Sequence, residues 1–182
     1  MVVKVISLAL AVLVAGPVCG SLELSSQQSV TTFTFITNAP AGIVRSCRRE
    51  NLSVKEGETD AAMGGVRVTP YVFTSISSSA CSLSGYPKLE LLNGKGRIVR
   101  RARRQHSDTT AEAVTIESGK TAWFNLYYNS GGTGHVGRPC PTYPKLRIIA
   151  PGITRPFVVR SQITSCARSE FDVSSIHPGM PD

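Results

Sequence analysis

The sequence predicts an all-β protein, an immunoglobulin-like antiparallel β-sandwich with two disulfides. Short segments in which apolar and polar residues alternate recur along the chain, as they do in sandwich folds. Helical spacing of apolar residues is sustained nowhere, and Gly, Pro, Ser and Thr separate the alternating segments. Four cysteines follow an export signal, and an even number in an exported protein indicates disulfides.

The first twenty residues predict a signal peptide. Lys4 precedes an apolar run over residues 5–15, and the small residues Val18 and Gly20 suit cleavage after Gly20. The run is too short to span a bilayer, which takes about 20 residues. We therefore expect an extracytoplasmic protein, secreted or periplasmic. Lipidation of Cys19 is the less favoured alternative, because residues 16–18 differ from the usual lipid-attachment sequence.

The remaining chain divides by composition. Residues 21–46 are rich in Ser and Thr and are interpreted as a flexible lead-in, followed by a sandwich over 47–178 and a tail over 179–182. Removal of residues 1–20 leaves 19 basic residues against 12 acidic ones, a net charge of +7. This charge favours solubility and attraction to anionic surfaces, and it says nothing about the fold.

Two strands are predicted between the first two cysteines of the mature chain, over residues 51–57 and 66–77. In the second strand, alternate apolar residues share one face: Val66, Val68, Val72 and Ile76. Pro70 lies within this run and has no amide hydrogen to donate. We therefore expect Pro70 at a sheet edge or a bulge.

The later segments continue the pattern. Residues 88–93 and 97–101 flank Gly94-Lys95-Gly96, which indicates a hairpin. Residues 112–130 hold two strands around a turn at Ser118-Gly119-Lys120. One face of the second of these strands is apolar, with Ala122, Phe124, Leu126 and Tyr128. Three further strands are expected in the last forty residues.

The positions of the cysteines favour the disulfides Cys47–Cys81 and Cys140–Cys166. Cys47 precedes the first strand and Cys81 follows the second, so antiparallel pairing places both at one end. Cys140 and Cys166 each precede a late strand. Four cysteines allow three pairings. Cys47–Cys166 with Cys81–Cys140 is the alternative if the first and last strands are parallel neighbours.

The order of these segments resembles a family of exported bacterial proteins. It has a cysteine before the first strand, CSLSGYP at 81–87, VTIESGKTAWFNLYYN at 114–129 and CPTYPKLRIIAPG at 140–152. The sequence resembles the family known as domain of unknown function 4232 over residues 47–178. The resemblance implies a β-sandwich at the bacterial cell envelope, in a family with many lipoproteins. It implies no catalytic residues, because the family has no established activity.

Five arginines within eight positions form the most conspicuous cluster of charge: Arg97, Arg100, Arg101, Arg103 and Arg104. Lys95 and His106 lie beside them. The cluster is a possible anion-binding site. It has no interleaved aromatic residues, so specific nucleic-acid binding is not expected. The other interpretation is an exposed hairpin edge that charge keeps soluble. Under both interpretations, residues 94–106 are expected to be exposed to solvent and to contribute little to folding.

Other candidate motifs favour structural interpretations. The GTGHVG motif at 132–137 precedes Arg138-Pro139-Cys140-Pro141, which cannot begin the helix of a dinucleotide site. The histidines are isolated: His106, His135 and His177. An acidic turn is favoured over a calcium site at Glu56, Glu58 and Asp60. Packing is favoured over an exposed sugar- or peptide-binding face at Trp123, Tyr127 and Tyr128.

These observations favour a non-enzymatic interaction or structural module at the bacterial cell envelope, monomeric and without a cofactor, metal site or catalytic residues. Its partner is then an anionic envelope polymer or another envelope protein. The alternative is a binder of anionic envelope or extracellular polymer through the arginine-rich hairpin. A weaker alternative is a hydrolase whose catalytic residues are dispersed along the chain.

The export signal yields a prediction for the mature chain. The purified exported protein should begin at Ser21 and carry no lipid, because the cleavage pattern points to the bond after Gly20. Intact mass spectrometry measures this directly. A mass that includes a diacylglycerol group on Cys19 would contradict the prediction and place the protein at a membrane surface.

Overall fold

The computed structural model describes residues 44–105, 111–131, 139–166 and 169–181. Within these ranges the only helical elements are two 3₁₀ turns, η1 (Arg49–Asn51) and η2 (Met63–Gly65). No helix in this part of the chain is long and apolar enough to cross a membrane. The prediction of an all-β sandwich with two disulfides is confirmed.

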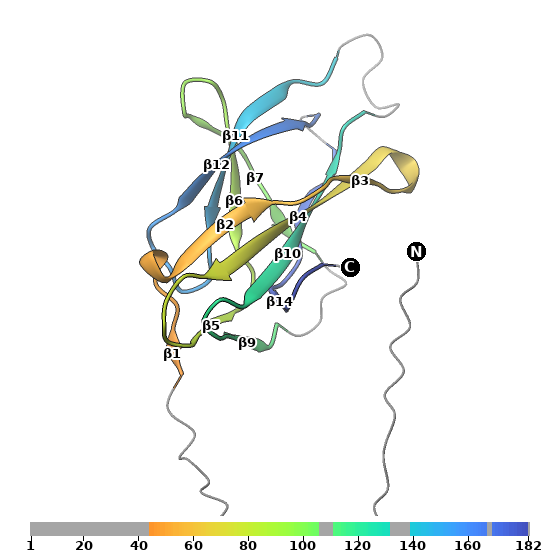
Figure 1. Ribbon diagram of the computed structural model, residues 1–182. Helices are drawn as coiled ribbons and strands as arrows, with labels where there is room; N and C mark the ends of the chain where they lie inside the picture. Colours follow the sequence, from red (N-terminus) through yellow and green to blue (C-terminus); the bar gives the residue numbers. More distant parts are fainter. Residues whose placement is uncertain (1–43, 106–110, 132–138, 167–168, 182) are drawn as a thin grey trace, which may run out of the picture. The chain divides into compact units, whose positions relative to one another are not determined.

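The strands form two packed layers and a smaller sheet (Figure 1). The larger layer has the order β2 (Leu52–Glu56), β4 (Val66–Ser75), β10 (Thr121–Asn129), β13 (Phe171–Val173) and β8 (Arg103–Arg104), with β3 (Asp60–Ala61) on β4 and β14 (His177–Pro178) on β10. The four-stranded layer has the order β12 (Phe157–Thr164), β11 (Thr142–Ile149), β6 (Lys88–Leu92) and β7 (Ile98–Arg101). The small sheet is β1 (Arg45–Ser46), β5 (Cys81–Ser84) and β9 (Ala113–Ile116). Most pairs are antiparallel, but β1–β5 and β8–β13 are parallel.

The core lies between the two layers. The predicted apolar face of β10 is confirmed, since all four of its residues are buried. The Phe124 ring stacks on Tyr71 at a centroid distance of 5.5 Å, and Phe73 reaches Phe157 of the opposite layer at 5.6 Å. Leu83 and Ile116 of the small sheet join the same core. Burial of such side chains supplies most of the driving force for folding, about 1.5–3 kcal/mol each.

The alternation in β4 is present, but the valine face is the outer one. The residues that face the core are Thr69, Tyr71, Phe73 and Ser75. Val68 and Val72 are half-buried on the outside of the sheet, and Ile76 is 63% exposed. The strand is apolar on both faces, so its period alone does not say which face is inside. The aromatic partners Phe124 and Phe157 decide it.

Pro70 lies at an irregularity of the ladder, the second of the two places expected for it. β4 lies between β2 and β10, so Pro70 is not at a sheet edge, but residues 57–59 lie opposite only Thr69 and Pro70, which makes a bulge. The β2 ladder ends opposite Tyr71, and the β3 ladder begins opposite Val68. The Pro70 carbonyl accepts a hydrogen bond from Gly57 at 2.8 Å in this gap. Because the N and O of a strand residue point to the same side, the missing donor of Pro70 faces the break, where no strand needs it.

The disulfides are Cys47–Cys81 and Cys140–Cys166, with Cα–Cα distances of 4.8 and 4.7 Å. This is the favoured pairing. β2 and β4 are antiparallel, as that pairing requires. The alternative pairing required the first and last strands to be parallel neighbours, but β4 and β10 lie between β2 and β13. The small strand β1 lies inside the segment that composition suggested was a flexible lead-in.

Gly57 yields a prediction about packing. A Cβ atom there would lie 2.9 Å from Pro70 Cγ and 3.2 Å from its carbonyl oxygen. We expect Gly57→Ala to lower the free energy of unfolding by about 1–3 kcal/mol, the usual cost of overpacking. Urea denaturation measures this. Gly94→Ala is the matched control, because nothing lies within 4 Å of its added Cβ, and equal effects of the two changes would refute the close approach.

Candidate functional site: the arginine segment and a basic sheet face

The arginine segment crosses from one layer of the sandwich to the other. β7 pairs with β6 at the edge of the four-stranded layer, and β8 pairs with β13 at the edge of the larger layer. Between them, the Ala102 amide donates to the Leu89 carbonyl at 2.9 Å. Beyond β8, Gln105 donates to the Val173 carbonyl at 3.0 Å. The segment therefore closes one side of the sandwich.

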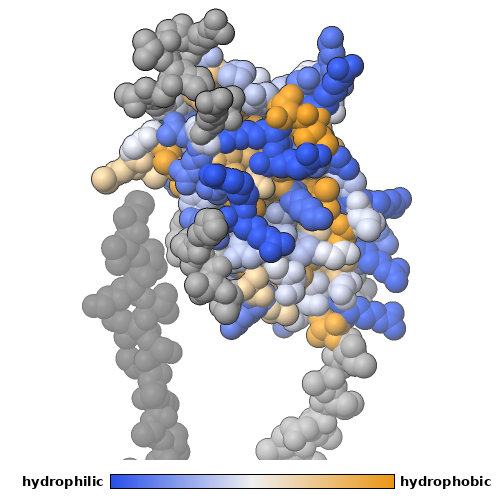
Figure 2. All heavy atoms as spheres, turned by 180° about the vertical axis from the view of Figure 1, so that it is seen from behind, coloured by the Kyte–Doolittle hydropathy of each residue, from blue (hydrophilic) through white to orange (hydrophobic). Residues whose placement is uncertain are grey.

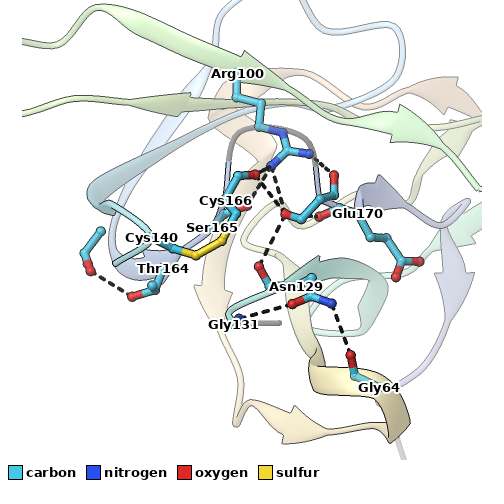
Figure 3. Close-up of a disulfide and its surroundings, with 11 residues drawn as sticks. Gly64, Arg100, Asn129, Gly131, Cys140, Thr164, Ser165, Cys166 and Glu170 are labelled. Atoms are coloured by element: carbon cyan, nitrogen blue, oxygen red, sulfur yellow. Dashed lines mark hydrogen bonds between the residues drawn. A yellow bond between two sulfur atoms is a disulfide. The ribbon is translucent and has the colours of Figure 1, made fainter. Parts of the chain in front are cut away.

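Arg100 is a structural residue of this closure (Figure 3). Its guanidinium donates to Ser165 Oγ at 2.7 Å, to the Cys166 carbonyl at 2.6 Å and to the Ser169 carbonyl. It also lies 5.0 Å from the ring centre of Phe171. Burial lowers the pKa of Arg100, and the positive charge of Arg103 adds to the effect. The group still stays charged at neutral pH. The expectation that this segment is merely exposed is wrong at Arg100.

Two other arginines of the cluster are in ion pairs. Arg101 Nε lies 3.0 Å from Glu90 Oε1, and Arg147 binds the other oxygen of Glu90, also at 3.0 Å. Arg103 forms a two-point contact with Asp172, at 2.8 and 3.2 Å. The Asp172 carboxylate raises the pKa of Arg103, first through the hydrogen bond and then through its charge. Internal partners therefore already take up part of the positive charge of the cluster.

The remaining two arginines lie apart from these. Arg104 is positioned over the ring of Tyr86, 5.4 Å from its centre. Arg97 is exposed at the β6–β7 hairpin, where its amide donates to Asn93 Oδ1 at 2.9 Å. The five arginines thus have different partners. Anion binding by the cluster as a whole stays a prediction.

The outer face of the four-stranded layer gathers basic side chains from four strands. Leu89, Leu91, Leu146 and Ile148 point into the core, so their neighbours along each strand point outward. Register places Glu90 beside Arg101 and Arg147, and Lys145 beside Arg160. We call the following set the basic face: Lys88, Arg101, Lys145, Arg147 and Arg160. Glu90 is the only acidic residue in these four strands.

Figure 2 shows the molecule from behind, with hydrophilic side chains crossing the surface between smaller hydrophobic areas. The apolar contribution from the strands of the basic face includes Ile98, 37% exposed, and Val158, 56% exposed. Only Arg101 of the basic face belonged to the sequence cluster. Lys145 and Arg147 are two positions apart in a predicted strand, which is a sign of a shared face. The register that adds Lys88 and Arg160 cannot be read from the chain.

The other candidate residues have structural surroundings. The Trp123 ring packs against His177 on the outer side of the larger layer, at 4.8 Å between ring centres. Tyr127 accepts a hydrogen bond from Asn125 at 3.3 Å, and Tyr128 is buried. The acidic residues of segment 56–60 belong to no group of three potential metal ligands in the described chain. GTGHVG, His106 and His135 lie outside the described residues.

Tyr71 is the one described group whose pKa rises far above its ordinary value. Burial is the main cause, and the nearby Glu56 carboxylate adds to it. The Tyr71 hydroxyl lies 3.3 Å from Ser161 Oγ inside the core. The phenol therefore stays protonated at any ordinary pH, where it acts as a hydrogen-bonding group rather than a nucleophile.

Fold and bonds together define a disulfide-stabilised β-sandwich domain, of the kind that folds in an oxidising compartment. The family described as Domain of unknown function (DUF4232) matches residues 47–178, most of the chain. The chain belongs to this family, as the resemblance indicated. A search of curated proteins found no match. The matched range begins at the first cysteine of the sandwich and ends with the last residue of β14.

Arg100 yields a prediction that corrects the expected tolerance of the arginine segment. Arg100→Ala removes the guanidinium donor to the Ser169 carbonyl and one of the donors to the Cys166 carbonyl, so we expect the free energy of unfolding to fall by about 2 kcal/mol. Arg97→Ala is the control and should change it by about 0.5 kcal/mol at most. Urea denaturation of both variants measures the difference. If Arg100→Ala is as stable as Arg97→Ala, the hydrogen bonds from Arg100 to the carbonyls do not contribute to the free energy of unfolding.

Proposed function

We propose that this protein is a non-enzymatic, extracytoplasmic binding domain of the bacterial cell envelope, and that its basic face binds an anionic polymer. The observation that carries the proposal is the charge of that face. Within its four strands, five basic side chains stand against the single carboxylate of Glu90, a net charge of +4. Glu56 of β2 lines the same hollow as Lys145 and Arg160, and the charge with Glu56 included is +3. A sheet surface with one sign of charge attracts and holds ligands of the opposite sign.

The spacing of the basic face suits a repeating ligand. Neighbouring strands lie about 4.8 Å apart, and residues two apart along one strand lie about 6.6 Å apart. Lys145 and Arg160 are direct cross-strand partners, while Arg147 follows two positions along β11. Several weak contacts of this kind add up when the anionic groups belong to one polymer. A polymer therefore fits this surface better than a single small anion does.

Glu90 arranges the face rather than neutralising it. Its side chain is only 10% exposed, and each of its two oxygens accepts from a different arginine. The pairs hold Arg101 and Arg147 at fixed positions on either side of β6. Lys88, Lys145 and Arg160 have no ion-pair partner among the described residues, so they are the cations with charge to offer a ligand.

The chemistry of the face favours envelope or extracellular polymers over nucleic acid. The aromatic residues of these four strands are Tyr143 and Phe157, and both pack on the core. Stacking on bases therefore has no support here. The disulfides and the family resemblance agree with a location outside the cytoplasm. The hydrolase alternative has less support, because His177, the histidine in the described part, packs on Trp123.

The proposal predicts salt-sensitive binding that depends on the basic face. Wild-type protein should bind poly(glycerol phosphate) or dextran sulfate. Its affinity should fall by about tenfold or more as the salt concentration rises from about 50 to about 200 mM. The triple variant Lys88→Ser, Lys145→Ser, Arg160→Ser should lose about tenfold in affinity at low salt. Fluorescence anisotropy with labelled polymer measures both.

The control variant carries Lys55→Ser, Arg67→Ser and Lys120→Ser, which remove the same charge from the larger layer or the turn before it. It should bind nearly as well as the wild type. If the two triple variants lose equal affinity for the polymer, binding depends on the net charge of the protein and not on the basic face. Absent or salt-insensitive binding in the wild type would remove the function, and retained circular dichroism in each variant excludes unfolding as the cause.

A further inference from the structure

A polar cavity of about 430 Å³ lies at the end of the sandwich where Cys47 and Cys81 are joined. Its lining comes from β1, from η1 and its preceding residue, and from the segment before β5. The polar and charged residues of its lining are Arg45, Ser46, Arg48, Asn51, Ser77 and Ser79. The basic face does not contribute to this lining, so the cavity is a separate site.

Several side chains of this cavity have hydrogen-bond donors to offer a ligand. The side-chain oxygen of Asn51 already accepts from the Arg48 amide at 3.0 Å, which leaves the NH₂ group of Asn51 to donate. Ser77 Oγ accepts from the Ser79 amide at 3.2 Å, which leaves its hydroxyl hydrogen. The guanidinium groups of Arg45 and Arg48 can only donate. A cavity rich in donors suits an anionic ligand.

The charge of the cavity also favours an anionic ligand. No Asp or Glu lines it. Among the described residues, Arg45 and Arg48 have no ion pair, in contrast to Arg101, Arg103 and Arg147. The lining thus has two arginines and no carboxylate, which favours an anion over a cation. Arginine also matches the geometry of phosphate and sulfate oxygens, because its planar fork donates two parallel hydrogen bonds.

The surroundings of the cavity are firmly held. The Cys47–Cys81 disulfide joins two of its walls. The Cys47 amide donates to the Ser82 carbonyl at 3.0 Å, and Ile76 donates to the Asn51 carbonyl at 2.8 Å. Parallel pairing places Arg45 beside Cys81. The backbone that carries these side chains is therefore held before a ligand arrives, which lowers part of the entropy that binding costs.

We propose that this cavity is a binding site for a tetrahedral oxyanion, the phosphate or sulfate ester group of a larger molecule. Arg45 and Arg48 bind its oxygens, and Asn51 and Ser77 donate further hydrogen bonds. The volume lies in the range of small-molecule sites, about 300–1,000 Å³. It therefore has room for the oxyanion together with part of the group that carries it. The site does not depend on the proposed function of the basic face.

The test is a titration of full-length mature protein with inorganic phosphate, sulfate and glycerol 3-phosphate, followed by NMR. Backbone amide shifts should saturate with ligand and cluster at Arg48, Asn51, Ser77 and Ser79, whereas chloride at equal ionic strength should leave them unchanged. Phosphate and sulfate arms separate the two ester classes. Tighter binding of glycerol 3-phosphate than of inorganic phosphate would indicate that the carrier group is also recognised.

The double variant Arg45→Ser, Arg48→Ser should bind phosphate about tenfold or more weakly, since two charge-assisted contacts are lost. The variant Lys55→Ser, Lys120→Ser removes the same charge elsewhere and should bind as the wild type does. The basic-face triple variant should keep its phosphate affinity, which separates this site from the proposed function. Three results would overturn the proposal. They are saturable shifts confined to the basic face, the absence of saturable shifts, and a phosphate affinity that is unchanged in the variant Arg45→Ser, Arg48→Ser. If that variant does not fold, the positions of the phosphate-induced amide shifts in the wild-type protein still test the proposal.

Discussion

The guanidinium of Arg100 is the contact on which the closure of the sandwich depends. On this side of the molecule a single segment belongs to both layers, through β7 in one and β8 in the other. The facing loop has carbonyl groups that no strand pairs, and a buried carbonyl without a donor is costly. The amide and hydroxyl of Ser169 serve the Cys166 carbonyl in part, at 3.2 and 2.8 Å. Arg100 supplies donors to the Cys166 and Ser169 carbonyls. A charged side chain thereby does the work that backbone amides do inside a sheet, next to the Cys140–Cys166 disulfide.

The basic residues of this chain serve two different purposes. Arg100, Arg101, Arg103 and Arg147 have internal partners and hold strands in place. Lys145 and Arg160, and at the other site Arg45 and Arg48, have no acidic partner in the described chain and present their charge outward. A high density of arginine along the sequence therefore does not locate the available charge. The dense cluster is largely structural, and strand register assembles the available cations from distant segments.

Much of the fold could be predicted from local patterns. The apolar face of β10 and the favoured disulfides follow from a period of two and from the positions of cysteines relative to strands. The sequence is less informative where the answer depends on a neighbouring strand. Of the two places expected for Pro70, an edge or a bulge, the structure has the irregularity between β2 and β3, and the segment of Pro70 does not itself decide between them. The inner face of β4 is set by rings on β10 and β12. The basic face depends on cross-strand register in the same way, so only its alternating pair in β11 was visible beforehand.

The gap beside Pro70 also bears on how molecules of this protein meet one another. β2 and β12 are the edge strands on the side opposite the arginine segment, and an edge strand exposes amides and carbonyls to which a second chain can pair. The first edge is interrupted between Glu56 and Asp60, and the ladder behind the second edge shifts register between Tyr143 and Lys145. Neither edge offers a long, regular template. Stacking of copies into a continuous intermolecular sheet, the first step toward amyloid-like aggregation, is therefore obstructed at these two edges by the shape of the backbone itself.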